Sequence, residues 1–144
     1  MGDHPLDGGG WLLRRAPTPR VGQPVKFTAP GAPVPKARPR LGRRGRVYTP
    51  QKTVNFEARV QLYALRAGMR PATGPMYMQI DFYMENRRTR DLDNLAKAVL
   101  DALNGTAYAD DNQVKELRVR KFLDRDNPRV NVECIPHPIR SGWA

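Results

Sequence analysis

The segment from Arg90 to Val114, which reads RDLDNLAKAVLDALNGTAYADDNQV, constrains the fold of this chain more than any other. Apolar residues recur in it at every third or fourth position, which is the spacing of an amphipathic helix that buries one face. We expect the helix to begin at Asp93, because a carboxylate at the N-cap accepts hydrogen bonds from the free amides of the first turn. Gly105 is expected to end it. The apolar positions are Leu92, Leu95, Ala96, Val99, Leu100 and Leu103.

Five of the chain's fourteen acidic residues fall within this segment. A backbone that is extended at Asp91 and turns helical at Asp93 would bring both carboxylates to the same side. Lys97 and Asp101 follow Asp93 at four-residue intervals, so they continue the same polar face. The pair Asp110-Asp111 comes after a short loop and before an apparent strand, and it can therefore return to the start of the helix.

Several carboxylates in one place suit a hard cation. Mg²⁺ prefers oxygen and is usually held by one or two carboxylates together with water and a substrate phosphate, where it polarises the phosphoryl group. Without a metal, crowded carboxylates would repel one another. We therefore predict that these acids hold Mg²⁺, with Mn²⁺ as a substitute, against a DNA phosphate. Lys97 is expected to orient a carboxylate or to stabilise phosphate charge. The alternative is an ordinary surface helix capped by Asp93, followed by a turn at Asp110-Asp111.

Basic residues dominate the first half of the chain. The formal net charge is +11, and from Gly8 to Phe56 there are eleven basic residues and no acid, which suits a polyanionic partner. Four prolines between Pro30 and Pro39 exclude a helix or a central strand there. The alternative to phosphate contact is a solvated charge run. The residues predicted to bind DNA are Lys36, Arg38 and Arg40 in this loop, with Arg88 and Arg90 beside the acids.

The motifs DLDNLAKAVLDALNG and ADDNQV, together with PVPKARPRLGRRGRVYTPQKT upstream, resemble the RusA family of Holliday-junction resolvases, common in bacteria and prophages. The resemblance spans Val25 to Cys134. It implies a small Mg²⁺-dependent homodimeric endonuclease that cuts four-way DNA junctions with paired nicks, in DNA recombination and repair. The residues that it assigns to metal binding and catalysis are Asp91, Asp93, Lys97 and Asp111, with Asp110 as the alternative ligand to Asp111.

The rest of the chain predicts strands at 25–29, 76–85, 114–123 and 130–134, the last two forming a hairpin about a turn at 124–128. Together with two helices, this order predicts a single α+β domain in which a mixed β-sheet packs two helices on one face. Residues 1–24 are expected to be a flexible arm, 25–136 the endonuclease domain and 137–144 a tail.

The first helix is expected to have Thr49 as N-cap and Pro50 at its first position, and to end at Gly68. Tyr48, just before it, either stacks on a base or packs on this helix. The expected buried stripe of the helix consists of Val54, Ala58, Leu62 and Leu65.

Cys134 is the only cysteine, so no intramolecular disulfide and no thiolate zinc cluster can form. It is expected to be a buried strand residue. No apolar run is long enough to span a membrane, and no clear signal peptide is present, so we expect a cytoplasmic protein.

The expected function is that of a Mg²⁺-dependent endonuclease for branched DNA. A four-way junction has two-fold symmetry, so a C2 homodimer with two equivalent sites suits paired cuts. One alternative is a basic DNA-binding accessory protein without catalysis. Another keeps the nuclease chemistry but prefers flaps or replication forks.

Overall fold

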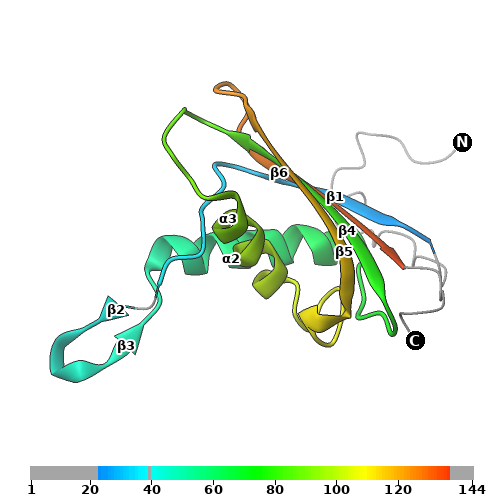
Figure 1. Ribbon diagram of the computed structural model, residues 1–144, viewed down its shortest axis with the longest axis horizontal. Helices are drawn as coiled ribbons and strands as arrows, with labels where there is room; N and C mark the ends of the chain where they lie inside the picture. The colour runs from blue at the N-terminus through cyan, green and yellow to red at the C-terminus, as the bar shows by residue number, and fades with distance from the viewer. Residues whose placement is uncertain (1–22, 39, 137–144) are drawn as a thin grey trace, which may run out of the picture.

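The computed structural model describes residues 23–38 and 40–136. This part contains a four-stranded sheet in the order β1-β6-β4-β5 and a separate two-stranded sheet, together with two α-helices (Figure 1). The expected arm, apart from its last two residues, and the expected tail lie outside the described residues. In chain order the elements are β1 (Val25–Pro30), β2 (Arg40–Leu41), η1 (Arg43–Gly45), β3 (Val47–Tyr48), α2 (Gln51–Arg66), β4 (Met76–Met84), α3 (Leu92–Ala102), η2 (Asp111–Gln113), β5 (Val114–Leu123) and β6 (Arg129–Pro136).

Strand β4 lies inside the larger sheet. It pairs antiparallel with β6 and parallel with β5, so the sheet is mixed, as predicted. The alternation along β4 places one set of side chains against the helices, and these residues are all buried: Met76, Met78, Ile80, Phe82 and Met84. A strand this apolar needs neighbours on both edges, and it has them.

The predicted hairpin between the last two strands is wrong, because β4 lies between β5 and β6. The turn from β5 to β6 instead passes the end of β4, where the Asp124 amide donates to the Met84 carbonyl at 2.8 Å. Most of β5 is exposed, so it suits the edge of the sheet, whereas β4 is buried along most of its length. Helix α3 supplies the crossover that a parallel β4–β5 pair requires.

Both helices cover the same face of the four-stranded sheet, as predicted (Figure 1). Helix α3 buries Leu95 and Val99, and α2 buries Phe56 and Val60, in the hydrophobic core. The opposite face of the sheet carries polar side chains. Asp81 on that face accepts two 2.8 Å hydrogen bonds from the Arg120 guanidinium.

The predicted buried stripe of α2 is wrong. The side chains that face the core are Thr53, Phe56, Val60 and Ala64, whereas Val54, Ala58, Leu62 and Leu65 are exposed. Both stripes follow the three- and four-residue spacing of a helix, and they lie roughly 150° apart around it, so periodicity alone does not choose between them. In the folded domain the ring of Phe56 lies in the core, where its burial removes a large apolar area from water.

The ends of α2 were predicted within one or two residues. The N-cap is Pro50 rather than Thr49, and no side chain caps the helix. At the other end, Gly68 adopts a φ of +84° and its amide donates to the Leu65 carbonyl, while the Met69 amide donates to the Ala64 carbonyl. These paired bonds satisfy the last carbonyls of the helix, and only glycine takes this left-handed conformation without steric cost.

Strands β2 and β3 form a short hairpin that was not predicted. Arg40 pairs with Tyr48 and Leu41 with Val47, and the hairpin projects away from the sheet and the helices (Figure 1). We call residues 40–48 the hairpin arm. Tyr48 is exposed, and its ring lies beside Gly42.

Cys134 is buried in β6, as predicted, and its thiol donates to Met78 Sδ at 3.4 Å. Burial raises the pKa of Cys134 to about 12, so the group stays a neutral thiol. Within residues 23–38 and 40–136, neither helix has the length and apolar composition needed to cross a membrane.

Candidate metal and nucleic-acid site

The first two predicted ligands stand at the start of α3. The helix begins at Leu92 with Asp91 as its N-cap, so the predicted N-cap at Asp93 is wrong by two residues. Asp91 has an extended backbone, with φ −67° and ψ 127°, and its side chain caps no amide. It accepts instead from the Asn94 side chain at 3.2 Å, while Asp93 accepts from the Asn94 amide at 2.9 Å. Both carboxylates therefore keep most of their oxygen lone pairs for another ligand.

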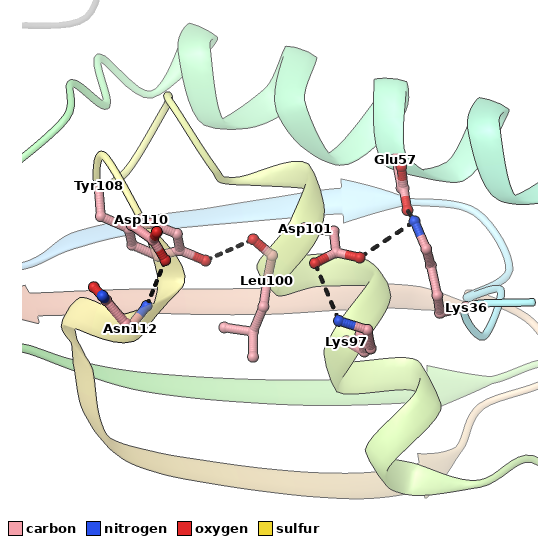
Figure 2. A network of polar contacts seen from close by, with 8 residues as sticks. All are labelled: Lys36, Glu57, Lys97, Leu100, Asp101, Tyr108, Asp110 and Asn112. Carbon is pink, nitrogen blue, oxygen red and sulfur yellow. Dashed lines mark hydrogen bonds and ion pairs between the residues drawn. The ribbon is translucent and has the colours of Figure 1, made fainter.

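Further along α3, Lys97 lies close to Asp101, an acid to which the resemblance assigns no role. Its ammonium is 3.6 Å from Asp101 Oδ1. The other oxygen of Asp101 is 3.2 Å from Lys36 Nζ, which in turn donates to Glu57 Oε1 on α2 at 2.6 Å. Figure 2 shows the Asp101 carboxylate between the two ammonium groups. These four charged groups link the Pro-rich loop, α2 and α3.

Lys36 is held by its backbone as well as by its side chain. Its amide donates to the Asn94 carbonyl in the first turn of α3 at 2.8 Å. Burial alone would lower the pKa of Lys36, but its hydrogen bonds to Glu57 and Asp101 outweigh this effect and raise the pKa above its ordinary value. The ammonium therefore stays charged and fixes the loop to the helix that begins with Asp91.

The second pair of predicted ligands stands on the 3-10 turn η2. Asp110 caps this turn by accepting from the Asn112 amide at 2.9 Å, and Gln113 accepts from the Asp110 amide at 3.1 Å. This reciprocal pattern is a capping box. The Gln113 side chain also donates to the Ala72 and Gly74 carbonyls. The turn is thus fixed on both sides, and Asp111 follows its N-cap.

Tyr108 anchors the loop that carries this pair. Its ring is fully buried and its hydroxyl donates to the Leu100 carbonyl in the last turn of α3 at 2.7 Å (Figure 2). Burial raises the pKa of Tyr108, so the hydroxyl remains a donor. A carbonyl near the end of a helix lacks a partner within the helix, and Tyr108 supplies one.

Replacement of Tyr108 by phenylalanine should lower the free energy of unfolding by about 1–3 kcal/mol, because the Leu100 carbonyl then stays buried without its partner. Urea unfolding followed by circular dichroism measures the change. Tyr77→Phe is the matched control, because its hydroxyl makes only a 3.4 Å contact with Gln79 on the open face of the sheet. Equal stability of Tyr108→Phe and wild type would contradict the anchoring role.

Asp111 is influenced by neighbouring charges on η2 and on the second half of α3. Partial burial raises the pKa of Asp111 most, the adjacent Asp110 carboxylate and then Asp101 raise it further, and Lys97 opposes them. Asp111 therefore lies within electrostatic reach of the Lys97–Asp101 pair. Negative charge crowded in this way is the situation that a bound cation relieves.

The structure does not join the predicted ligands into one closed cluster. Across residues 23–38 and 40–136, no three side chains among His, Cys, Asp and Glu stand close enough together to hold a metal ion. The donors present nevertheless fit Mg²⁺, because they are all carboxylate oxygens and Mg²⁺ takes one or two of these, completing its shell with water and phosphate. Asp91, Asp93 and Asp111 would hold it.

The predicted DNA-binding residues lie in two parts of the chain, just before α3 and in the Pro-rich loop with the base of the hairpin arm. Arg88 is exposed and its amide donates to the Asn86 side chain, while the Arg90 carbonyl accepts from Lys121 Nζ of β5 at 2.8 Å. Arg38 is exposed in the Pro-rich loop. Arg40 begins β2, and its backbone places it at the base of the hairpin arm.

Residues 30–135 match the family described as Endodeoxyribonuclease RusA, a match that covers the acids, Lys97 and the basic loop. The chain belongs to the RusA family. A relative from Bacillus subtilis strain 168, named Uncharacterized protein YqaN, is 36% identical over 135 residues, covering 75% of this chain and 93% of the relative.

Two further RusA relatives are named for their activity. The Crossover junction endodeoxyribonuclease RusA of Escherichia coli K12 is 48% identical over 49 residues, which cover 33% of this chain and 41% of that protein. The protein of the same name from Enterobacteria phage 82 has the same identity and coverage. The chain therefore matches less than half of the length of these two relatives.

Sequence reasoning on this RusA chain missed three supporting residues. The capping role of Gln113 had a signal, since an acid followed three residues later by Gln is a capping-box pattern. Lys121 and the ion-pair role of Lys36 had none, because their partners lie far away in the sequence. The predicted DNA contact of Lys36 stays a prediction.

Lys36→Met should lower the free energy of unfolding by about 1–3 kcal/mol, because Glu57 and Asp101 then lose a charge-assisted partner in a half-buried place. Lys52→Met is the matched control, since Lys52 is exposed on α2 and a surface change of this kind stays within about 0.5 kcal/mol. Chemical denaturation of both variants tests this. Identical stabilities would show that the Lys36 ion pairs hold nothing in place.

Proposed function

We propose that this RusA-family chain is a Mg²⁺-dependent endonuclease that resolves Holliday junctions by paired nicks, in DNA recombination and repair. The observation that carries the proposal is the family match over residues 30–135, which includes Asp91, Asp93, Lys97 and Asp111. Support comes from their placement at the start of α3 and on η2, with Asp111 in electrostatic reach of Lys97.

The chain's own residues divide the work. Asp91, Asp93 and Asp111 hold the metal, which when bound polarises the phosphoryl oxygens and lowers the pKa of a water. Mn²⁺, which also accepts carboxylate oxygen, is expected to substitute. Lys97 places its ammonium where negative charge develops on the phosphate. Asp101 orients Lys97 through their 3.6 Å contact.

Phosphate contacts position the DNA on this site. Arg90 borders the first acid, and we assign it to the scissile phosphate, with Arg88 and Arg38 on neighbouring phosphates. Lys36 already has two carboxylate partners, so its role is to hold the loop that presents Arg38. Replacing Arg38 should then reduce the salt dependence of binding more than replacing Lys36.

A homodimer completes the proposal. A four-way junction is two-fold symmetric, and its resolution requires one cut in each of two opposed strands. Two copies related by a two-fold axis present two equivalent sites to those strands.

The test is cleavage of a panel of labelled substrates that share one sequence: a four-way junction, a flap, a replication fork and a linear duplex. We expect Mg²⁺-dependent symmetric nicks in the four-way junction and much slower cutting of the others. Faster cutting of flaps or forks would reassign the substrate. Tight junction binding without any nick would leave a DNA-binding accessory protein.

A further inference from the structure

The hairpin arm exposes apolar side chains. Leu41 is 76% exposed and Val47 is 67% exposed, the two highest values among the large apolar residues that the structure describes. They are register partners in the two-stranded sheet, so their side chains lie together on one face of the arm. Tyr48 is exposed as well, beside Gly42. An apolar pair this open indicates a binding surface rather than a misplaced core.

The arm has no packing role that would explain the pair. Its strands pair only with each other, and the arm projects away from the sheet and both helices (Figure 1). Its tip is closed by a 2.6 Å bond from the Gly42 amide to the Arg46 carbonyl and by positive φ angles at Arg44 and Gly45. The tip is thus a defined turn that carries the pair outward.

Only positive charge surrounds the apolar pair. Arg43, Arg44 and Arg46 of the tip are all exposed, and the sequence has no acid from Gly8 to Phe56. A second copy of the arm would therefore be repelled. A partner for this surface must combine negative charge with flat apolar faces, and a nucleic acid with unstacked bases does so, because phosphates flank each base.

We propose that the hairpin arm enters the branch point of the DNA, where Leu41 and Val47 press against unstacked bases while the arginines of the tip contact the flanking phosphates. This inference rests on the proposed function. A branch point is the place in DNA where base stacking is already interrupted, so an apolar wedge costs least there. The arm would then contribute to the choice of branched over linear DNA.

The experiment places 2-aminopurine, whose fluorescence rises when it unstacks, next to the branch point of a four-way junction in EDTA, where no metal-dependent cutting occurs. Wild type should raise the fluorescence. The double variant Leu41→Ala/Val47→Ala should lose most of this rise and weaken junction binding about tenfold or more, since burying a leucine side chain is worth at least that factor. Its salt dependence should stay unchanged, because no charge is removed.

Two variants serve as controls. Leu65→Ala makes the same chemical change at an exposed residue of α2, and it should keep the full fluorescence rise. Arg43→Gln/Arg46→Gln should lower the slope of log K against log salt by roughly 0.9 for each lost phosphate contact on duplex DNA. Circular dichroism should show native folding of all variants, and Leu41→Phe, which keeps the apolar side chain, should keep the rise.

The outcomes separate the wedge from the proposed function. If wild type cuts four-way junctions but Leu41→Ala/Val47→Ala keeps the full fluorescence rise and affinity, the wedge is rejected and the nuclease stands. If wild type does not cut any junction in Mg²⁺, the proposed function fails, whatever the fluorescence shows. If wild type binds phosphatidylserine vesicles and Leu41→Ala/Val47→Ala loses this binding while its junction binding stays intact, the wedge is also overturned, in favour of a membrane surface.

Discussion

Asp93→Asn should abolish the cutting of a four-way junction while the variant still folds and binds the junction. Asparagine keeps the size of the side chain and an acceptor for the Asn94 amide, but it loses the charge that holds a metal. A bound metal lowers the barrier by several kcal/mol, so losing it should slow the reaction by about a thousandfold or more. Asp91→Asn and Asp111→Asn should behave alike.

Single-turnover cleavage in saturating Mg²⁺ measures this loss, and a gel-shift assay in EDTA measures binding, which should be as tight as for wild type or tighter, because removing an acid lowers repulsion toward DNA. Glu133→Gln is the matched control, since Glu133 is the register partner of Gln79 between β6 and β4 and lies on the sheet face opposite the helices. Any of the three variants that cuts at a near wild-type rate identifies a carboxylate that is not a required ligand.

Lys97→Ala should fold normally, bind the junction and cut very slowly. Lys97 is 60% exposed, and a surface pair of this kind contributes only about 0.3–0.5 kcal/mol to stability. As a group that stabilises phosphate charge in the transition state, it would contribute a few kcal/mol, so its removal should slow cutting about a hundredfold or more. These two magnitudes separate a catalytic lysine from an ordinary surface residue.

The measurement is again single-turnover cleavage, here with Lys52→Ala as the control at an exposed lysine of α2. The cleavage rate of Asp101→Asn should lie between those of wild type and Lys97→Ala, because this change removes the contact that orients Lys97 and leaves the ammonium in place. A Lys97→Ala rate within about threefold of wild type, which is under a kcal/mol of barrier, would end the catalytic assignment.

Local patterns in the sequence predicted much of the fold. The alternation of β4 and the helical spacing of α3 are strong signals, because each element buries one complete face against the same core. The polar face of α3, with Lys97 and Asp101, follows directly from the buried one, whereas Asp110-Asp111 were predicted from their position after a short loop and from the resemblance. Gly68 ended α2 as predicted because the left-handed turn needs glycine there.

Features set by distant partners could not be predicted. The order of strands depends on which strand needs two neighbours, and β5 carried the same alternation whether it paired with β6 or with β4. Lys36 had the appearance of one charge among many, because Glu57 and Asp101 lie on two different helices. The burial of Phe56 rather than Leu62 required the sheet to be in place.

The most direct test of the account is the cutting of a synthetic four-way junction by wild-type protein, with and without Mg²⁺. We expect paired symmetric nicks that appear with Mg²⁺ or Mn²⁺ and vanish in EDTA. The Asp93→Asn variant should make no nicks at any metal concentration. Junction binding without nicks at saturating metal, or nicking that persists in EDTA, would contradict it.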